Sequence, residues 1–200
     1  MTQNNNTLSI HECSPFEFLD NMKENKHIIM FDDNTEYSKS IQFSFLKKGL
    51  EKGEPGIYVM PYEKDVIEKE MKNYGIDVDK YKKDNLLNVY QSPYAVHYPQ
   101  EDPFDTLLRK IFPVDTTVPH RIVGMIDFDM STKKGMETFL QSEKKSDSIF
   151  HSFNGSWMCT YNTSEIPPEN RLNWIKELIK THDTVIFTSS KGDGICFDLK

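Results

Sequence analysis

Residues 40–64 read SIQFSFLKKGLEKGEPGIYVMPYEK, and they place a helix, a turn and a strand in immediate succession. Apolar residues recur at helical spacing up to Gly49 and Gly53, and a glycine at either position is a typical helix end. Residues 57–61 (IYVMP) then form a short apolar run of the kind that enters a buried strand. This stretch therefore predicts one helix-to-strand unit of an α/β fold.

The same alternation continues on both sides of this unit. Strand-like runs are expected at residues 26–31, 57–61, 86–90, 121–128, 156–161, 184–188 and 194–199. Helical patterns are expected at residues 35–52, 65–74, 104–112, 131–150 and 168–180. The run at 121–128 has no polar alternation, which is typical of a strand buried on both faces. The pattern predicts a three-layer α/β/α fold with a mostly parallel sheet and an antiparallel edge at the C-terminus. Within this sheet we expect residues 28–31, 57–60 and 122–126 to form neighbouring parallel strands.

Length and composition predict one soluble domain. The chain has 200 residues, a size that is typical of a single domain, and 28% of them are charged. We expect residues 1–7 to be a flexible tail and residues 8–200 to form the domain. The formal net charge of −7 opposes binding to nucleic acid, whose affinity for proteins comes mostly from neutralised phosphates.

The cysteine, histidine and hydropathy patterns argue against a metal-binding, a secreted or a membrane-spanning protein. The three cysteines are far apart in sequence, and the six histidines include no pair at i,i+4 spacing, so we predict no metal site and no cofactor. The N-terminus has neither a basic start nor an apolar core, so we predict no signal peptide and a cytoplasmic location. No apolar run approaches the ~20 residues that span a membrane.

The order of these segments resembles a known family. Residues 40–64 are similar to the segment of KaiC-type RecA-like ATPases that leads from the phosphate loop into the second strand. More specifically, the chain resembles the MEDS family of methanogen and methylotroph DcmR-type sensory domains, through HIIMFDD at 27–33, GLEKGEPGIYV at 49–59, and WMCTY at 157–161. The resemblance implies a RecA-like (P-loop NTPase-like) fold and a sensory function.

The segment that corresponds to the phosphate loop lacks the chemistry of one. Such a loop needs glycines that bring backbone amides to the phosphates, and a Lys that neutralises them. Residues 31–40 (FDDNTEYSKS) contain no glycine and three acids. Lys39 imitates the Lys of that motif but lies about one position late on the helix. We therefore predict that the chain is not an enzyme and has no catalytic residue.

Seven residues are expected at the carboxyl ends of the strands, where ligands of α/β sheets bind. We expect them to border one crevice, with Tyr62 or Tyr94 as a wall and the loop at 93–103 near it. By the resemblance, Glu63 corresponds to a catalytic carboxylate of KaiC-like ATPases. Asp127 and Asp129 correspond to the magnesium-binding acids of those ATPases. The candidate ligand-binding residues are Asp32, Asp33, Asn34, Thr35, Glu63, Asp127 and Asp129. Each also has a purely structural interpretation, as a helix cap or a first-turn acid.

Three functions remain open from the sequence. The first is a non-catalytic sensory domain that binds a small ligand or a signalling protein at the degenerate nucleotide site; the resemblance implies an apolar or one-carbon-derived ligand. The second is a residual KaiC-type ATPase or kinase. The third is an assembly module that forms a homo-oligomer. The glycine-free loop favours the first.

Overall fold

The computed structural model describes residues 12–23, 25–33, 35–91, 117–125 and 132–199. The strands are β1 (Glu12–Cys13), β2 (His27–Asp32), β3 (Gly56–Met60), β4 (Leu87–Gln91), β5 (His120–Gly124), β6 (Gly155–Asn162), β7 (Thr184–Thr188) and β8 (Gly194–Asp198). The helices are α1 (Pro15–Asn21), α2 (Thr35–Glu51), α3 (Lys64–Asn73), α4 (Val78–Lys83), α6 (Lys133–Phe150) and α7 (Pro168–Ile179), with a 3₁₀ turn at Thr163–Glu165.

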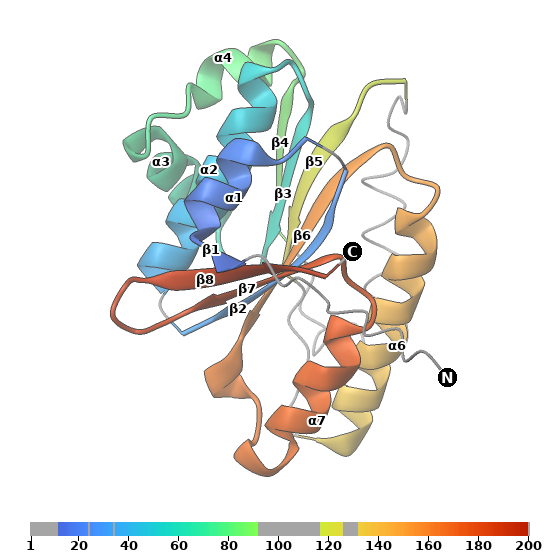
Figure 1. The fold of residues 1–200 in the computed structure, drawn as a ribbon. Coiled ribbons are helices and arrows are strands. Elements are labelled where there is room, and N and C mark those ends of the chain that lie inside the picture. The colour runs from blue at the N-terminus through green and yellow to red at the C-terminus, as the bar shows by residue number, and fades with distance from the viewer. Residues whose placement is uncertain (1–11, 24, 34, 92–116, 126–131, 200) are drawn as a thin grey trace.

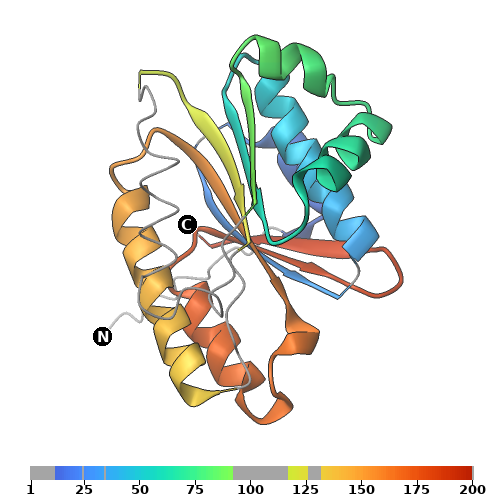
Figure 2. The same ribbon diagram turned by 180° about the vertical axis from the view of Figure 1, so that it is seen from behind.

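All these strands lie in one sheet between two layers of helices. Helices α1–α4 cover one face of the sheet, and α6 and α7 cover the other (Figures 1 and 2). Each face has its own apolar core, one formed with residues such as Phe45 and Met71, the other with residues such as Phe139 and Trp174. Because both faces are covered, every residue of β2 and β3 is buried. The predicted three-layer α/β/α fold is confirmed.

The strand order is β1-β8-β7-β2-β6-β5-β3-β4. Strands β7, β2, β6, β5, β3 and β4 pair in parallel, and β8 pairs antiparallel with both β7 and β1. The antiparallel edge near the C-terminus is therefore confirmed. Strand β1 and helices α1 and α4 were not expected from the sequence, because each is too short to show a clear periodicity.

One expected neighbourhood is wrong. The strands at 28–31, 57–60 and 122–126 were expected to lie side by side, and β5 does pair with β3. Strand β6, however, lies between β2 and β5. Strand alternation along a chain predicts parallel pairing but leaves strand order open, since a later strand can insert at the centre of the sheet.

The glycines and the acidic residue of the segment at 49–56 are explained by the way helix α2 packs against strand β5. A side chain at Gly49 would come within 2.5 Å of Arg121, which passes against α2 at this point. Arg121 is buried, lies over the Phe45 ring and donates to Glu54 Oε2 at 2.5 Å. Gly53 has φ +81°, so it provides the left-handed turn that ends α2. These contacts tie α2 to β5. None of the helices in the described part of the chain has the length and apolarity needed to cross a membrane.

Candidate functional site

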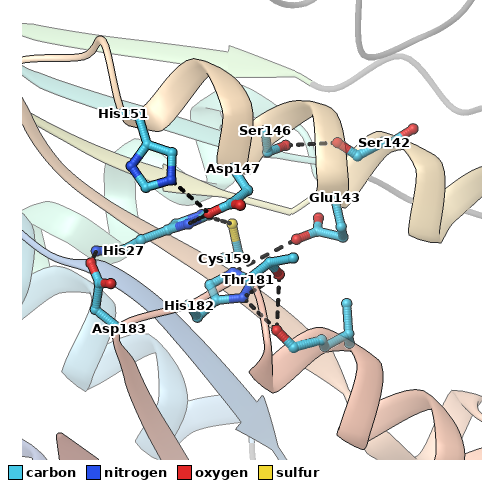
Figure 3. A network of polar contacts seen from close by, with 11 residues as sticks. His27, Ser142, Glu143, Ser146, Asp147, His151, Cys159, Thr181, His182 and Asp183 are labelled. Atoms are coloured by element: carbon cyan, nitrogen blue, oxygen red, sulfur yellow. Dashed lines mark hydrogen bonds and ion pairs between the residues drawn. The ribbon is translucent and has the colours of Figure 1, made fainter. Parts of the chain in front are cut away.

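Two regions of the structure group polar side chains and are candidate functional sites. The first is the edge of the sheet formed by the carboxyl ends of the parallel strands, where the sequence predicted a ligand site. The second is a group of buried polar side chains beneath α6 and α7, which the sequence analysis did not predict (Figure 3).

At the sheet edge, Asp32 ends β2 and is buried, whereas Asp33 is exposed. The backbone carbonyl of Asp32 accepts from the Thr163 hydroxyl at 3.4 Å, and the backbone N–H of Asp33 donates to the Thr188 hydroxyl at 3.3 Å. Thr188 also contacts the hydroxyl of Ser38 on α2 at 3.3 Å. The exit from β2 is therefore fastened to the end of β7, and the two aspartates differ sharply in exposure.

Lys39 is paired with a carboxylate of the neighbouring helix α3. Its Nζ lies 2.7 Å from Glu70 Oε2 on α3 and 5.5 Å from the centre of the Tyr62 ring. The side chain thus bridges α2 and α3, as expected from its late position on the helix. In this arrangement the Lys39 charge is compensated by Glu70 and not by a phosphate.

The remaining predicted residues are spread out. Glu63 is exposed and precedes α3, with no side-chain bond to the helix N-terminus. It follows β3, three places from β2 in the sheet, which puts the two strand ends about 14 Å apart at a strand spacing of about 4.8 Å. Asn34, Asp127 and Asp129 lie outside the described residues, as does the loop at 93–103, and only the backbone of Thr35 is described. The shared crevice stays a prediction.

An open groove of about 740 Å³ lies next to Thr188. Phe187 and Ile195 give it apolar surface, and Glu12 and Asp193 give it acidic surface. A compound in this groove would meet apolar walls and acidic groups, a lining that suits neutral or cationic molecules better than phosphates.

The second region, which we call the buried cluster, consists of His27, Glu143, Cys159, Tyr161 and His182. All five side chains are at most 8% exposed. His27 begins β2, Cys159 and Tyr161 belong to β6, His182 precedes β7, and Glu143 lies on α6. The β2–β6 register pairs Ile29 with Cys159, which places His27 and Cys159 on the same face of the sheet.

The ligand-type atoms of this cluster converge. His27 Nε2 lies 3.8 Å from Cys159 Sγ, and the rings of His27 and His182 are 4.0 Å apart between centroids. His182 Nε2 lies 3.6 Å from Glu143 Oε2. The other oxygen of Glu143 accepts a hydrogen bond from the Tyr161 hydroxyl at 2.5 Å. Figure 3 shows the side chains of His27, Glu143, Cys159 and His182 pointing toward one another.

Burial controls the protonation of the acidic members. Removal from water raises the pKa of Glu143 to about 7, although the Tyr161 hydrogen bond lowers it. Burial, together with the nearby Glu143 carboxylate, raises the pKa of the Cys159 thiol well above its usual value. The Tyr161 pKa rises for the same two reasons. In the absence of a compensating positive charge, Cys159 and Tyr161 are neutral.

Sequence reasoning missed this cluster because its members are far apart in the chain, 132 positions in the case of His27 and Cys159. One signal was present in the helix at 133–150. The buried face of α6 carries Ser142, Glu143 and Ser146 beside the apolar Phe139. A helix face that turns polar groups into the interior indicates that they meet other polar groups there.

Comparison with known proteins agrees with this architecture. The chain aligns over 83% of its length with 72% of a KaiC-like protein from the hyperthermophilic archaeon Pyrococcus horikoshii OT3, at 19% identity and a TM-score of 0.59, which supports the RecA-like fold. A search of curated proteins found no match. The model of the MEDS family, described as the methanogen/methylotroph DcmR sensory domain, matches residues 26–183. The chain therefore belongs to the MEDS family of sensory domains.

Proposed function

We propose that this chain is a non-catalytic sensory domain that binds a small ligand at the carboxyl-end edge of its sheet. The main observation behind this proposal is the position of Lys39. It is the lysine that imitates the phosphate-loop motif, and its Nζ lies 2.7 Å from Glu70. Together with the glycine-free exit from β2, this contact argues against phosphate binding.

The groove beside Thr188 supplies the proposed ligand site. It adjoins the end of β2 through the hydrogen bond from the Asp33 N–H to Thr188. Its lining combines Phe187 and Ile195 with Asp193, so we propose a small neutral or cationic compound. A neutral compound would also agree with the apolar or one-carbon-derived ligand that the resemblance to DcmR-type sensory domains implies.

The test is a thermal-shift panel of small neutral and cationic compounds, run beside Mg²⁺-ATP and followed by calorimetry of any hit. We expect at least one compound to raise the melting temperature, and we expect Mg²⁺-ATP to bind no more tightly than about millimolar, because acidic groups face the site. Asp193→Lys should abolish the response to a cationic compound. Asp84→Lys makes the same charge change at an exposed position that does not line the groove, and it should leave the response intact.

Two results would contradict the proposal. A micromolar affinity for Mg²⁺-ATP, lost in Lys39→Ala, would favour the residual ATPase instead. A cationic hit that raises the melting temperature equally in Asp193→Lys and Asp84→Lys would place the ligand elsewhere.

A further inference from the structure

We propose that His27, Cys159 and His182 form a binding site for a divalent transition-metal ion of the zinc class, with Glu143 as the fourth ligand. This inference does not depend on the proposed ligand at the sheet edge. The two histidines of the proposed metal site lie at the amino ends of parallel strands, opposite the proposed ligand site: His27 begins β2, and His182 precedes β7.

The spacing of the donor atoms suits a tetrahedral ion. One ligand atom from each of His27, Cys159 and His182 lies within 4.8 Å of the other two. In a tetrahedral site with Zn–N of about 2.0–2.1 Å and Zn–S of about 2.3 Å, neighbouring ligand atoms are about 3.3–3.6 Å apart. The separations among these three ligand atoms therefore need to contract by up to about 1.5 Å. Side-chain adjustment supplies such a shift.

Both histidines are oriented as metal ligands usually are. His182 Nδ1 lies 2.8 Å from the carbonyl oxygen of Leu178, which can only accept a hydrogen bond, so the proton is on Nδ1 and the lone pair on Nε2. His27 Nδ1 lies 3.7 Å from Asp147 Oδ1, while its Nε2 faces Cys159. A carbonyl or carboxylate on the outer nitrogen is the usual way to fix the tautomer and orientation of a metal-binding histidine.

Glu143 provides the second, independent observation. Its carboxyl is buried, yet Oε2 makes no hydrogen bond with any residue that the structure describes. This oxygen lies 3.6 Å from His182 Nε2, on the side of the cluster. Tyr161 holds the other oxygen. A buried carboxylate oxygen held in this position is costly unless a cation or donor meets it.

The charges of the four ligands balance a dication. One thiolate and one carboxylate contribute two negative charges, and two neutral imidazoles contribute none, so the complex with M²⁺ is neutral in a buried setting. Binding releases the thiol proton, and a metal lowers the pKa of a bound thiol enough for this to occur at neutral pH. The donor set of one sulfur and two nitrogens selects Zn²⁺-like ions over Mg²⁺ and Ca²⁺, which prefer oxygen.

Polar side chains also lie between the cluster and the protein surface. Asp147 is partly exposed and faces His27, and the exposed His151 lies 3.8 Å from Asp147 on the solvent side of α6. Figure 3 shows this series of side chains leading from His151 through Asp147 to the cluster. Polar groups along α6 thus connect the surface with the buried donors.

The test uses Co²⁺ as a spectroscopic probe. Metal is stripped from the full chain with a chelator, and Co²⁺ is added both to the folded protein and during refolding from denaturant, so that burial of the site cannot hide binding. We expect one equivalent to bind, with a thiolate-to-cobalt charge-transfer band and the intense visible bands of tetrahedral Co²⁺. Added Zn²⁺ should bleach both.

Matched variants separate metal binding from packing. Cys159→Ala should abolish the charge-transfer band, and Cys196→Ala, at another buried cysteine, should retain it. His182→Asn keeps a donor near the Leu178 carbonyl but removes the Nε2 ligand, so Co²⁺ affinity should fall by more than about 100-fold while the melting temperature of the metal-free protein changes little. His120→Asn alters a buried histidine outside the cluster and should bind Co²⁺ normally.

Two outcomes would overturn the proposal. One is the absence of Co²⁺ binding in both the folded and the refolded sample. The other is binding that survives in Cys159→Ala with an unchanged spectrum, which would assign the metal to surface histidines and acids.

Discussion

The sheet edge and the buried cluster lie on the same strands but differ in almost every physical respect. At the edge, β2 ends in Asp32 and Asp33, the second of which is exposed, and an open groove adjoins them. At the other end, β2 begins with His27, which is buried among Cys159, His182 and Glu143. The edge is where ligands of this fold class bind. The cluster has the more specific chemistry.

This difference shows that location in a fold and chemistry of the side chains give separate evidence about function. The edge is a candidate because of its topology, and its described residues are ordinary acids and hydroxyls. The cluster is a candidate because three segments of the chain place one sulfur and two nitrogen donors within 4.8 Å of one another, whatever the fold. The predictions below test whether the two regions act together or separately, from the largest effect to the smallest.

Val123→Asp should eliminate both regions at once. Val123 is fully buried in β5, which pairs with β3 and β6, so the substitution places a charge in the sheet that carries both sites. An unpaired buried charge costs several kcal/mol, a large part of the about 5–15 kcal/mol that stabilises a domain. We expect loss of cooperative melting by calorimetry. Val66→Asp, at a valine with 48% exposure on α3, is the control and should melt normally.

Removal of metal should destabilise the protein through the cluster alone. With free Zn²⁺ at about 100 times its dissociation constant, binding contributes about 2.7 kcal/mol, which corresponds to about 5–10 °C in melting temperature for a chain of this length. Scanning calorimetry with Zn²⁺ and with chelator should show this difference. In Cys159→Ala the two curves should coincide, and a Zn²⁺-dependent shift that persisted there would contradict the assignment.

The sequence predicts the edge better than the cluster for a physical reason. Alternating apolar runs such as 57–61 are local signals, so most strands and helices were predicted within a few residues. Gly49 or Gly53 was expected to end the helix at 35–52, and Gly53 has the left-handed φ that such positions use. Proximity of strand ends to one edge then follows from parallel pairing alone.

The cluster could not be predicted because it depends on strand order. His27 and Cys159 meet only because β6 inserts beside β2, and the linear sequence does not encode that neighbourhood in any local pattern. The absence of paired histidines at i,i+4 led us to predict no metal site, since short spacing is the usual sign of one. Ligands collected from four separate elements leave no such sign. The polar face of α6 at Ser142, Glu143 and Ser146 was the accessible indication.

Asp147→Asn should weaken metal binding without affecting the edge. The carboxylate at 3.7 Å from His27 Nδ1 is expected to orient the imidazole and increase its basicity, and loss of such an outer partner typically costs about 10–100-fold in affinity. Co²⁺ titration should show a decrease near the lower value, because the asparagine oxygen keeps a polar group beside Nδ1 after the carboxylate charge is lost. His151→Ala removes a neighbour that contacts Asp147 only from the exposed side, and it should change affinity much less. Equal effects of both variants would indicate a general change in α6.

Lys39→Ala should produce the smallest effect and separates the edge from a true phosphate loop. In a working loop the lysine neutralises the bound phosphates, so its removal abolishes nucleotide binding. Here Lys39 and Glu70 are both partly exposed, and such a pair contributes about 0.2–1 kcal/mol to stability. We expect a loss of this size in denaturant melts, no change in the calorimetric response to Mg²⁺-ATP, and no change in Co²⁺ binding.

A double-mutant cycle with Glu70→Ala should recover most of the loss as coupling between the two side chains. If instead the single variant removed a measurable ATP signal while the Glu70 variant kept it, Lys39 would be serving a phosphate, and the edge would have to be assigned to nucleotide binding.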